Sequence, residues 1–359
     1  MPKVSQMRTA GLMLIAAVLV IGPFYQGLFF PHSLLASVAV VAAAFGLWAY
    51  GRRTDRTGLN LPGGWAGGLL LALVGVYVLQ SGWAAYFRGN LEWILRALAA
   101  WMAFVIIREE GTEKTRRRLG WALMASASVV VLLGLLEYGG FFQANPGLKA
   151  FFSIPSAGVG LRIYSVFQYP NAAAAFLMAI GLVGNNLMLV EQSLKHRLAL
   201  AAMSALIAVG FFFTLSRGAL VVVPPVVLLL LVGLPRRQIL PSLMLMVSSV
   251  GLPILVGMKP IAAAGPAGNW GLVVLWALLA AAAGAVATWG VLQLNRLPQR
   301  SLWIGTGALL AAAALGLAFL VLTRPLDQVL PAAVIRLADI NLETDNAKNR
   351  LEFADDALR

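Results

Sequence analysis

Residues 162–190 read RIYSVFQYPNAAAAFLMAIGLVGNNLMLV. From Asn171 to Val190 this stretch carries no charged residue. It is long enough to cross a bilayer, because a spanning helix needs about 17–25 mostly apolar residues. At its start stand Arg162, three aromatic residues and the Pro170-Asn171 pair, and such polar groups are costly to place in lipid. The stretch therefore predicts a membrane-spanning helix with a polar segment at its mouth.

The composition of the whole chain agrees with a membrane protein. Of 359 residues, 60% are hydrophobic and 11% are charged, and the mean hydropathy is +0.84. Soluble domains carry about 25% charged residues. There is no cysteine, and His32 and His196 stand far apart, so we predict no disulfide, no metal site and no cofactor.

Further apolar runs of spanning length predict an all-α, polytopic transmembrane helix bundle. We predict about eleven spans, at 10–30, 33–50, 65–83, 91–107, 119–138, 171–190, 198–215, 218–234, 239–257, 270–292 and 302–323. The first run is too long for a cleavable signal peptide, and no small-residue cleavage site follows it. Residues 1–324 are thus the predicted transmembrane domain.

The lysines and arginines predict the orientation of the bundle. With a cytoplasmic N-terminus, sixteen of them fall on the inside and five in outside loops before the last run. This positive-inside bias explains most of the net charge of +13, so we expect no nucleic-acid partner. The inside group is Lys3, Arg8, Arg52, Arg53, Arg56, Arg108, Lys114, Arg116, Arg117, Arg118, Lys195, Arg197, Arg236, Arg237, Arg296 and Arg300, and the outside group is Arg88, Lys149, Arg162, Arg217 and Lys259.

The C-terminal residues have a different character from the rest of the chain. Seven of the fourteen acidic residues follow Arg324, on the predicted outer side. Residues 346–359 have the spacing of an amphipathic helix, which needs a partner to pack on. We therefore interpret 325–359 as the start of a large extracytoplasmic loop in a longer protein, with a further span beyond Arg359.

Two outer features concentrate polar groups. Asn171 is placed to be the N-cap of the sixth span, whose positive end would then face outward, with Arg162 and Tyr169 just before it. At the second feature, span seven passes into span eight within Thr214-Leu-Ser-Arg-Gly-Ala219, so Ser216 can cap the new helix with Arg217 in its first turn. Arginine suits phosphate because its planar guanidinium donates two parallel hydrogen bonds. These features predict an anion-binding outer face.

Other interpretations of these polar groups stay open. Tyr164, Phe167 and Tyr169 also fit an interfacial aromatic belt with Arg162 reaching lipid headgroups. Arg88, Glu92 and Arg96 have the spacing of an intrahelical ion-pair ladder. Alternatively, Arg96, which lies more than a turn into its span, lines a cavity for the anionic donor at this outer face. Glu137 fits an interfacial or paired acid better than a catalyst.

A family resemblance joins these motifs. Arg162 with Pro170-Asn171 before a span, then Thr214-x-Ser216-Arg217-Gly218-Ala219, resembles the O-antigen ligase and polymerase family of bacterial membrane glycosyltransferases. The tail Asn349-Arg350-Leu-Glu-Phe-Ala-Asp-Asp-Ala-Leu358 resembles the segment that enters the large outer loop of that family. The resemblance covers roughly residues 160–359. The first five spans match only in number and polarity.

The resemblance implies transfer of a glycan from undecaprenyl pyrophosphate to an acceptor glycan, lipid or protein outside the bacterial plasma membrane. Arg162 and Arg217 match the arginines that bind the donor pyrophosphate, and Tyr169, Asn171, Ser216, Arg96 and Arg350 are candidate substrate contacts. The family's proposed base is a histidine that this chain lacks, so we expect it beyond Arg359. A polymerase with the same donor chemistry, a transporter or flippase of lipid-linked glycan, and a non-catalytic scaffold remain the alternatives.

Overall fold

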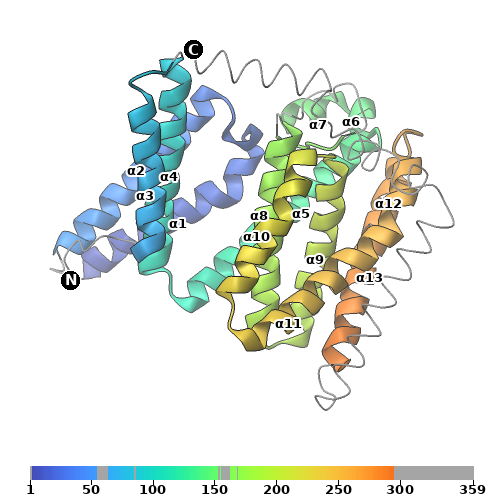
Figure 1. Ribbon diagram of the computed structural model, residues 1–359. Coiled ribbons are helices and arrows are strands. Elements are labelled where there is room, and N and C mark those ends of the chain that lie inside the picture. Colours follow the sequence, from blue (N-terminus) through green and yellow to red (C-terminus); the bar gives the residue numbers. More distant parts are fainter. Residues whose placement is uncertain are drawn as a thin grey trace. The chain divides into compact units, whose positions relative to one another are not determined.

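The computed structural model describes residues 2–54, 64–84, 86–152, 154, 162–167 and 169–294. Within these ranges the regular structure is entirely helical (Figure 1). The chain divides into two compact units, and the boundary between Leu123 and Met124 falls inside helix α5 (Glu113–Tyr138). Each unit is described by itself.

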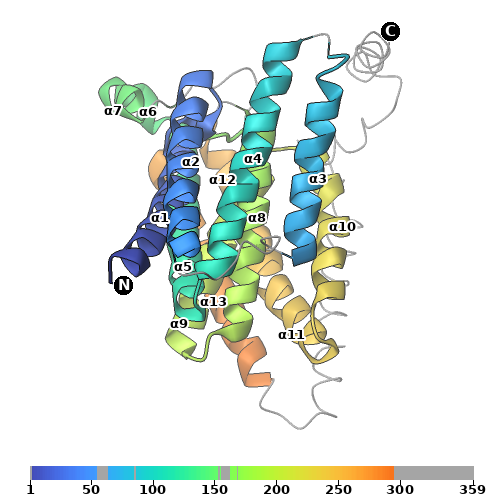
Figure 2. The ribbon, with the colours of Figure 1, turned by 90° about the vertical axis from the view of Figure 1, so that its left-hand side faces the viewer.

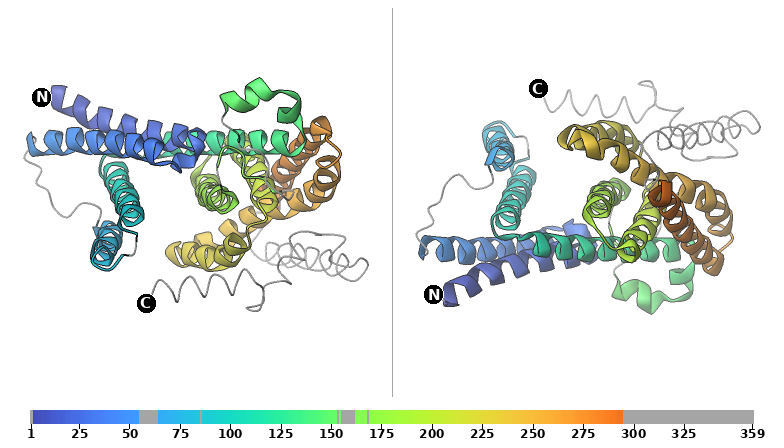
Figure 3. Two further views of the ribbon diagram at one scale, coloured as in Figure 1. Left: turned by 90° about the horizontal axis from the view of Figure 1, so that it is seen from above. Right: turned by 90° about the horizontal axis from the view of Figure 1, so that it is seen from below.

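The first unit pairs two long apolar helices with a helical hairpin. Its elements are α1 (Pro2–Ile21), η1 (Gly22–Phe24), η2 (Gln26–Leu28), α2 (Pro31–Thr54), α3 (Gly64–Gln80), α4 (Phe87–Glu110) and the first part of α5. Helices α1 and α2 run side by side (Figures 2 and 3). They approach closely at Gly11, where an added Cβ would lie 2.8 Å from the carbonyl oxygen of Ala44. Small residues at such crossings permit close packing of helices in lipid.

Ion pairs join three helix ends of the first unit. Arg8 pairs with Glu110 at 2.7 Å, and the indole Nε1 of Trp48 donates to the other oxygen of Glu110 at 3.0 Å. Arg52 pairs with Glu109 at 2.7 Å. The start of α1 and the ends of α2 and α4 therefore lie at one end of the unit, as the predicted alternation of spans requires.

The second unit packs around α9. Its elements are the rest of α5, α6 (Phe141–Ala144), α7 (Pro146–Phe151), α8 (Pro170–Val190), α9 (Leu194–Phe213), α10 (Arg217–Gly233), α11 (Arg236–Met246), η3 (Val247–Gly251), α12 (Leu252–Ala264) and α13 (Trp270–Leu294). Helix α9 contacts α8, α12 and α13 (Figures 1 and 3). The element η3 is a π-helical turn that continues α11 into α12.

Several connections of the second unit meet at one end, which we call the Arg162 end. The ring of Tyr138, at the end of α5, lies 5.2 Å from the ring of Phe213, at the end of α9. Phe141 packs on Trp270, the first residue of α13, with ring centroids 5.3 Å apart. Helices α8 and α10 begin at this end, and α6 and α7 also lie there (Figure 1).

The helices confirm a multi-pass membrane protein. Eight of the described helices are long and apolar enough to cross a bilayer, and α3 and α10 are shorter apolar helices. Together these ten match the first ten predicted spans. Two predicted boundaries were wrong: the first long helix ends at Ile21 rather than near residue 30, and the ninth continues to Ala264 rather than 257. The predicted span 302–323 and the segment 325–359 lie outside the described residues.

Candidate functional site

The turn between α9 and α10 is the centre of the candidate site. The amide of Ser216 donates to Oγ1 of Thr214 at 3.3 Å, and Oγ of Ser216 accepts from the amide of Ala219 at 3.3 Å. Ser216 is therefore the N-cap of α10, and Arg217 is the first residue of that helix. The predicted cap is confirmed. Thr214 and Ser216 are both buried, whereas Arg217 is half-buried.

Arg162 lies against this turn although it is far away in the sequence. Its Nε donates to the carbonyl oxygen of Thr214 at 3.0 Å, and its Nη2 donates to that of Leu215 at 3.3 Å. The amide of the next residue, Ile163, donates to the carbonyl of Phe213 at 2.8 Å. The structure thus brings Arg162 to the segment that leads directly into Arg217.

Asn171 has a different role from the predicted one. Tyr169 is the N-cap of α8, without a side-chain capping bond, and Pro170 is the first helical residue. Proline is suited to that position because it has no amide hydrogen to satisfy. Asn171 therefore stands inside the first turn, where its Oδ1 accepts from the hydroxyl of Ser216 at 2.8 Å. It links the first turns of α8 and α10 instead of capping α8.

Helix α5 supports the segment that carries Arg162. The hydroxyl of Ser165 donates to the carbonyl of Val130 at 2.6 Å. At Gly134 a Cβ would lie 2.5 Å from Cγ2 of Ile163 and 3.0 Å from Cβ of Ser165, so only glycine allows this approach. Neither Gly134 nor Ser165 is among the site residues predicted from the sequence. A single glycine within the bulky run VVVLLGLLEY was the available signal.

Two residues of the site have strained backbones. Ser165 has φ of +53° and Leu215 has φ of +49°, in the left-handed region that residues with a side chain rarely adopt. Leu215 provides one of the two carbonyls that Arg162 binds. Strain of this kind is unfavourable by about 1–3 kcal/mol per residue and gathers at functional sites, where surrounding contacts maintain it.

The aromatic residues near Arg162 do not form one interfacial belt. Phe167 is 6% exposed and packs on Phe176, with ring centroids 5.3 Å apart. Tyr164 is half-buried, and only Tyr169, which is 47% exposed, has the accessibility of a belt residue. The belt interpretation is therefore wrong for Phe167. Arg162 itself binds carbonyl groups of the protein, which differs from an arginine that only reaches lipid headgroups.

A charged pair lies nearby at the Arg162 end. Oε1 of Glu137, near the end of α5, is 3.1 Å from Nζ of Lys149 on α7. The Glu137 side chain is only 10% exposed, and its Oε2 is buried without a hydrogen-bond partner. The prediction of a paired acid is confirmed.

Arg96 belongs to the first unit. Its Nη1 and Nη2 donate to the carbonyls of Leu28 and Phe29 at 3.2 and 3.1 Å, and its guanidinium lies 5.7 Å from the ring of Trp93. The predicted ion-pair ladder is therefore wrong, because Arg96 binds backbone carbonyls rather than Glu92. Arg350, another candidate contact, lies outside the described residues.

The described residues contain no group of three or more metal-ligand side chains. His196 lies 3.5 Å from Glu191 in the turn between α8 and α9, which is the opposite end of these helices from Arg162. His32 stacks on Phe30 in the first unit. Neither histidine lies in the segments that contact Arg162.

Comparison with known proteins assigns no relative to this chain. No family model, no curated protein and no solved structure matches it. The resemblance to the O-antigen ligase and polymerase family therefore depends on the motif residues themselves. Of these, residues 214–219 and most of 162–171 lie within the described structure.

Proposed function

We propose that this chain is a membrane glycan transferase that takes its donor from undecaprenyl pyrophosphate at the outer face of the bacterial plasma membrane. One observation supports this most directly. Arg162 is hydrogen-bonded to the turn that precedes Arg217 and the start of α10. The guanidinium of Arg162, the backbone of Arg217 and the first turn of a helix therefore belong to one short region.

The electrostatics of this segment favour a diphosphate. Helix N-termini carry a partial positive charge, and the Ser216–Asn171 hydrogen bond joins the N-terminal turns of α8 and α10. Arginine adds a permanent charge and a planar set of donors that matches phosphate oxygens. The surrounding residues are largely buried, and a low local dielectric strengthens such contacts.

The proposed reaction needs stabilisation of a leaving group. An acceptor hydroxyl or amine attacks the anomeric carbon of the glycan, the bond from that carbon to the pyrophosphate oxygen breaks, and the acceptor loses a proton. Negative charge grows on the pyrophosphate as it leaves. Arg162 and Arg217 would act on that charge, and interactions that strengthen in the transition state are the ones that accelerate a reaction.

The strained turn also supports a functional role. Thr214 is fully buried, and its carbonyl and that of Leu215 are both used to bind Arg162. A bulky residue with positive φ, such as Leu215, persists only when its neighbours hold it in that conformation. The turn is therefore suited to fix the direction of Arg217 at the start of α10.

The test is a product assay with the purified full-length protein and an undecaprenyl-pyrophosphate-linked glycan, with acceptor present and without added metal. Wild type should form the transferred product. Arg162→Ala and Arg217→Ala should each lower the rate more than about 200-fold, beyond the roughly 3 kcal/mol upper value for one charged hydrogen bond. The matched control is Arg236→Ala, an exposed arginine that begins α11, beyond the far end of α10, and this variant should transfer like wild type.

The same assay separates the alternatives. A polymerase would join donor repeat units to each other in the absence of acceptor. A transporter or flippase would leave the lipid-linked glycan chemically unchanged and alter only its sidedness in vesicles. If both alanine variants transfer glycan at the wild-type rate, the assignment of Arg162 and Arg217 to the donor site is wrong.

A further inference from the structure

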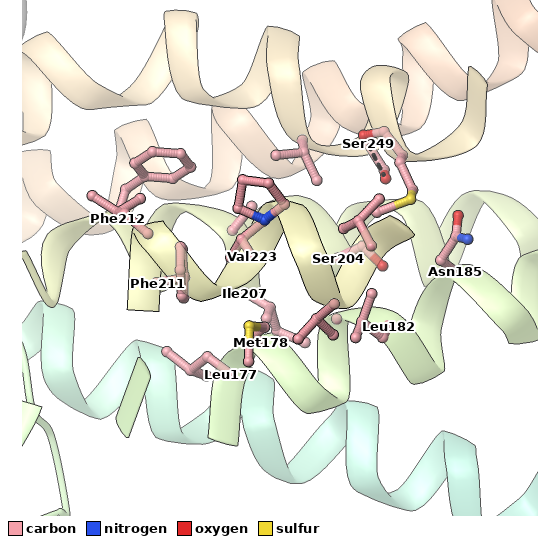
Figure 4. Close-up of a pocket in the computed structure, with 18 residues that line it drawn as sticks. Leu177, Met178, Leu182, Asn185, Ser204, Ile207, Phe211, Phe212, Val223 and Ser249 are labelled. Atoms are coloured by element: carbon pink, nitrogen blue, oxygen red, sulfur yellow. Dashed lines mark hydrogen bonds between the residues drawn. The ribbon is translucent and has the colours of Figure 1, made fainter. Parts of the chain in front are cut away.

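The second unit also contains a cavity, which lies within the membrane-spanning part of its helices. The cavity has a volume of about 230 Å³ and is bounded by α8, α9, α10 and η3 (Figure 4). Its walls are mostly apolar, as the side chains of Leu177, Phe211 and Val223 illustrate. Phe211 and Phe212 stand toward one end of the cavity, whereas Asn185, Ser204 and Ser249 stand toward the other (Figure 4).

Two buried polar atoms at that second end have no hydrogen-bond partner. They are Oδ1 of Asn185, a residue 2% exposed, and Oγ of Ser204, a residue 4% exposed. The amide nitrogen of Asn185 is satisfied, since it donates to the hydroxyl of Ser242 at 2.7 Å. Buried polar atoms in proteins are almost always hydrogen-bonded, so two orphans in one cavity indicate a missing partner.

The two orphan oxygens lie close to the same part of α8. A Cβ on Gly184 would be 2.7 Å from Oγ of Ser204, so the Ser204 hydroxyl rests against the residue next to Asn185. The missing side chain at Gly184 makes this approach possible. Beside them is the π-helical turn η3, to which Ser249 belongs, and π-helical turns are frequent at functional sites.

We propose that this cavity binds a lipid alcohol, with the hydroxyl at Asn185 and Ser204 and the hydrocarbon chain along the apolar walls. A hydroxyl group carries both functions that the orphans require, a donor for Oδ1 of Asn185 and an acceptor for the Ser204 hydroxyl. A pure hydrocarbon would leave both oxygens unpaired. The cavity exceeds the volume of about 150 Å³ that accommodates benzene in an engineered protein core.

Because the polar end of the cavity lies inside the membrane-spanning part of the helices, the ligand group that binds there should be uncharged. Asn185 is fifteen residues beyond Pro170, so it lies about 22 Å along α8 from the Arg162 end. A charged group inside the bilayer is strongly disfavoured unless it is paired, and no charged residue lines the cavity. The ester carbonyls of phospholipids only accept hydrogen bonds, so they cannot satisfy Oδ1 of Asn185. A hydroxyl meets both conditions, and this site is independent of the proposed glycan transfer.

The test uses a photoreactive octanol that carries a diazirine, with the methyl ether of the same molecule as the control probe. The full-length protein, in phosphatidylcholine nanodiscs, is irradiated with each probe, and the labelled residues are identified by mass spectrometry. The alcohol should label residues of the cavity wall about threefold to tenfold more than the ether, the factor expected for the one hydrogen bond to Asn185 that the ether cannot donate.

Two variants complete the test. Ser204→Ala removes an unsatisfied hydroxyl, so it should leave folding intact while lowering the labelling by both probes, because the alcohol and the ether both accept from Ser204. Asn185→Leu removes the acceptor of the hydroxyl, so it should bring the labelling by the alcohol to that of the ether, and it should also lower stability because the bond to Ser242 is lost. The control is Ser248→Ala, because Ser248 is buried but bonded to Leu245 and Thr288 and does not line the cavity. Equal labelling by alcohol and ether, or unchanged labelling in Ser204→Ala, would indicate a cavity filled with water or hydrocarbon and overturn the proposal.

Discussion

The hydroxyl of Ser216 donates to Oδ1 of Asn171 at 2.8 Å and so ties the first turn of α10 to the first turn of α8. Both helices present the positive end of their dipoles at this end of the second unit, and Arg162 and Arg217 add two full charges there. Like charges in one place are mutually unfavourable. An anion bound between them would relieve this repulsion, so we expect the site to be stabilised by its ligand.

The Ser216–Asn171 bond can be measured by a double-mutant cycle. Ser216→Ala should lower the free energy of unfolding by about 0.5–2 kcal/mol, because it removes both the cap of α10 and the bond to Asn171. Asn171→Ala should cost less, because Asn171 does not cap α8. Thermal unfolding in detergent should give a coupling of about 0.5–1.5 kcal/mol between the two.

The control for this cycle is Ser193→Ala. Ser193 is the N-cap of α9 but makes no side-chain capping bond, so its substitution should change stability little. Additive effects of Ser216→Ala and Asn171→Ala would contradict the bond as drawn.

Gly134 gives a second prediction, which concerns packing. Gly134→Ala places a Cβ 2.5 Å from Cγ2 of Ile163, so the segment that begins with Arg162 must move. We expect a loss of stability of about 1–3 kcal/mol, typical of overpacking, together with reduced glycan transfer. Gly181→Ala on α8 is the matched control, because its Cβ would meet only Ile207, at 3.9 Å. Transfer unaffected in Gly134→Ala would argue against support of the site by α5.

The positions of the spans could be predicted from the sequence because apolar length alone determines them. Long apolar runs, even those with a few charged residues such as Glu92 and Arg96, predicted all ten of the described apolar helices, and the Ser216 cap followed from a hydroxyl directly before a helix. Errors occurred where local pattern and tertiary contacts compete. Asn171 fits the preferences for an N-cap, but Pro170 begins the helix one residue earlier, and the side chain of Asn171 is used for a contact with another helix.

The contacts that build the site could not be predicted in the same way. Arg162 binds carbonyls of Thr214 and Leu215, which are more than fifty residues away, and such a pairing leaves no periodic signal. For Arg96 the sequence predicted a contact that the structure does not show. The spacing to Glu92 indicated an ion pair, whereas the guanidinium of Arg96 donates to the carbonyls of Leu28 and Phe29. In both cases the irregular backbone of another segment supplies the acceptors.

The pair of Glu137 and Lys149 gives an asymmetric prediction. Lys149→Met leaves the carboxylate of Glu137 buried and without its partner, so it should destabilise the protein by about 1–3 kcal/mol. Glu137→Gln should cost less, because the side chain of Lys149 is 22% exposed and can reach water. Chemical unfolding of both variants tests this order. Lys259→Met, at an exposed position on α12, is the control, and a smaller effect of Lys149→Met than of Glu137→Gln would contradict the prediction.

The orientation of the chain is testable by cysteine labelling, since the natural sequence has no cysteine. Single cysteines after residues 56, 114 and 236 should be protected in intact cells and accessible after lysis. Cysteines near residues 150 and 335 should react with a membrane-impermeant reagent from outside. The excess of sixteen cations over five on the predicted inner side is the physical reason. Labelling of residue 150 only from the cytoplasm would put the Arg162 end on the wrong side for the proposed donor.

The last prediction concerns the shape of the side chain at Arg162. Lysine keeps the charge, but its single ammonium cannot reproduce the planar donors that reach Thr214 at 3.0 Å and Leu215 at 3.3 Å. We therefore expect Arg162→Lys to lose nearly as much transfer activity as Arg162→Ala and to lower the unfolding temperature as well. The capping bond of α10 comes from Ser216, and Arg217 is the first residue of that helix, so we expect Arg217→Lys to lose transfer activity with a smaller change in stability.

Transfer rates and unfolding temperatures of the same preparations decide this point. A fall of both quantities in Arg162→Lys, with a fall of the rate alone in Arg217→Lys, would mean that Arg162 positions the turn while both arginines act on the donor. The reason is that the strained Leu215 depends on its carbonyl contact with Arg162, and Arg217 follows it by two residues. If Arg162→Lys instead retains wild-type transfer and stability, charge alone suffices at that position, and the fork-shaped contact with the turn is dispensable.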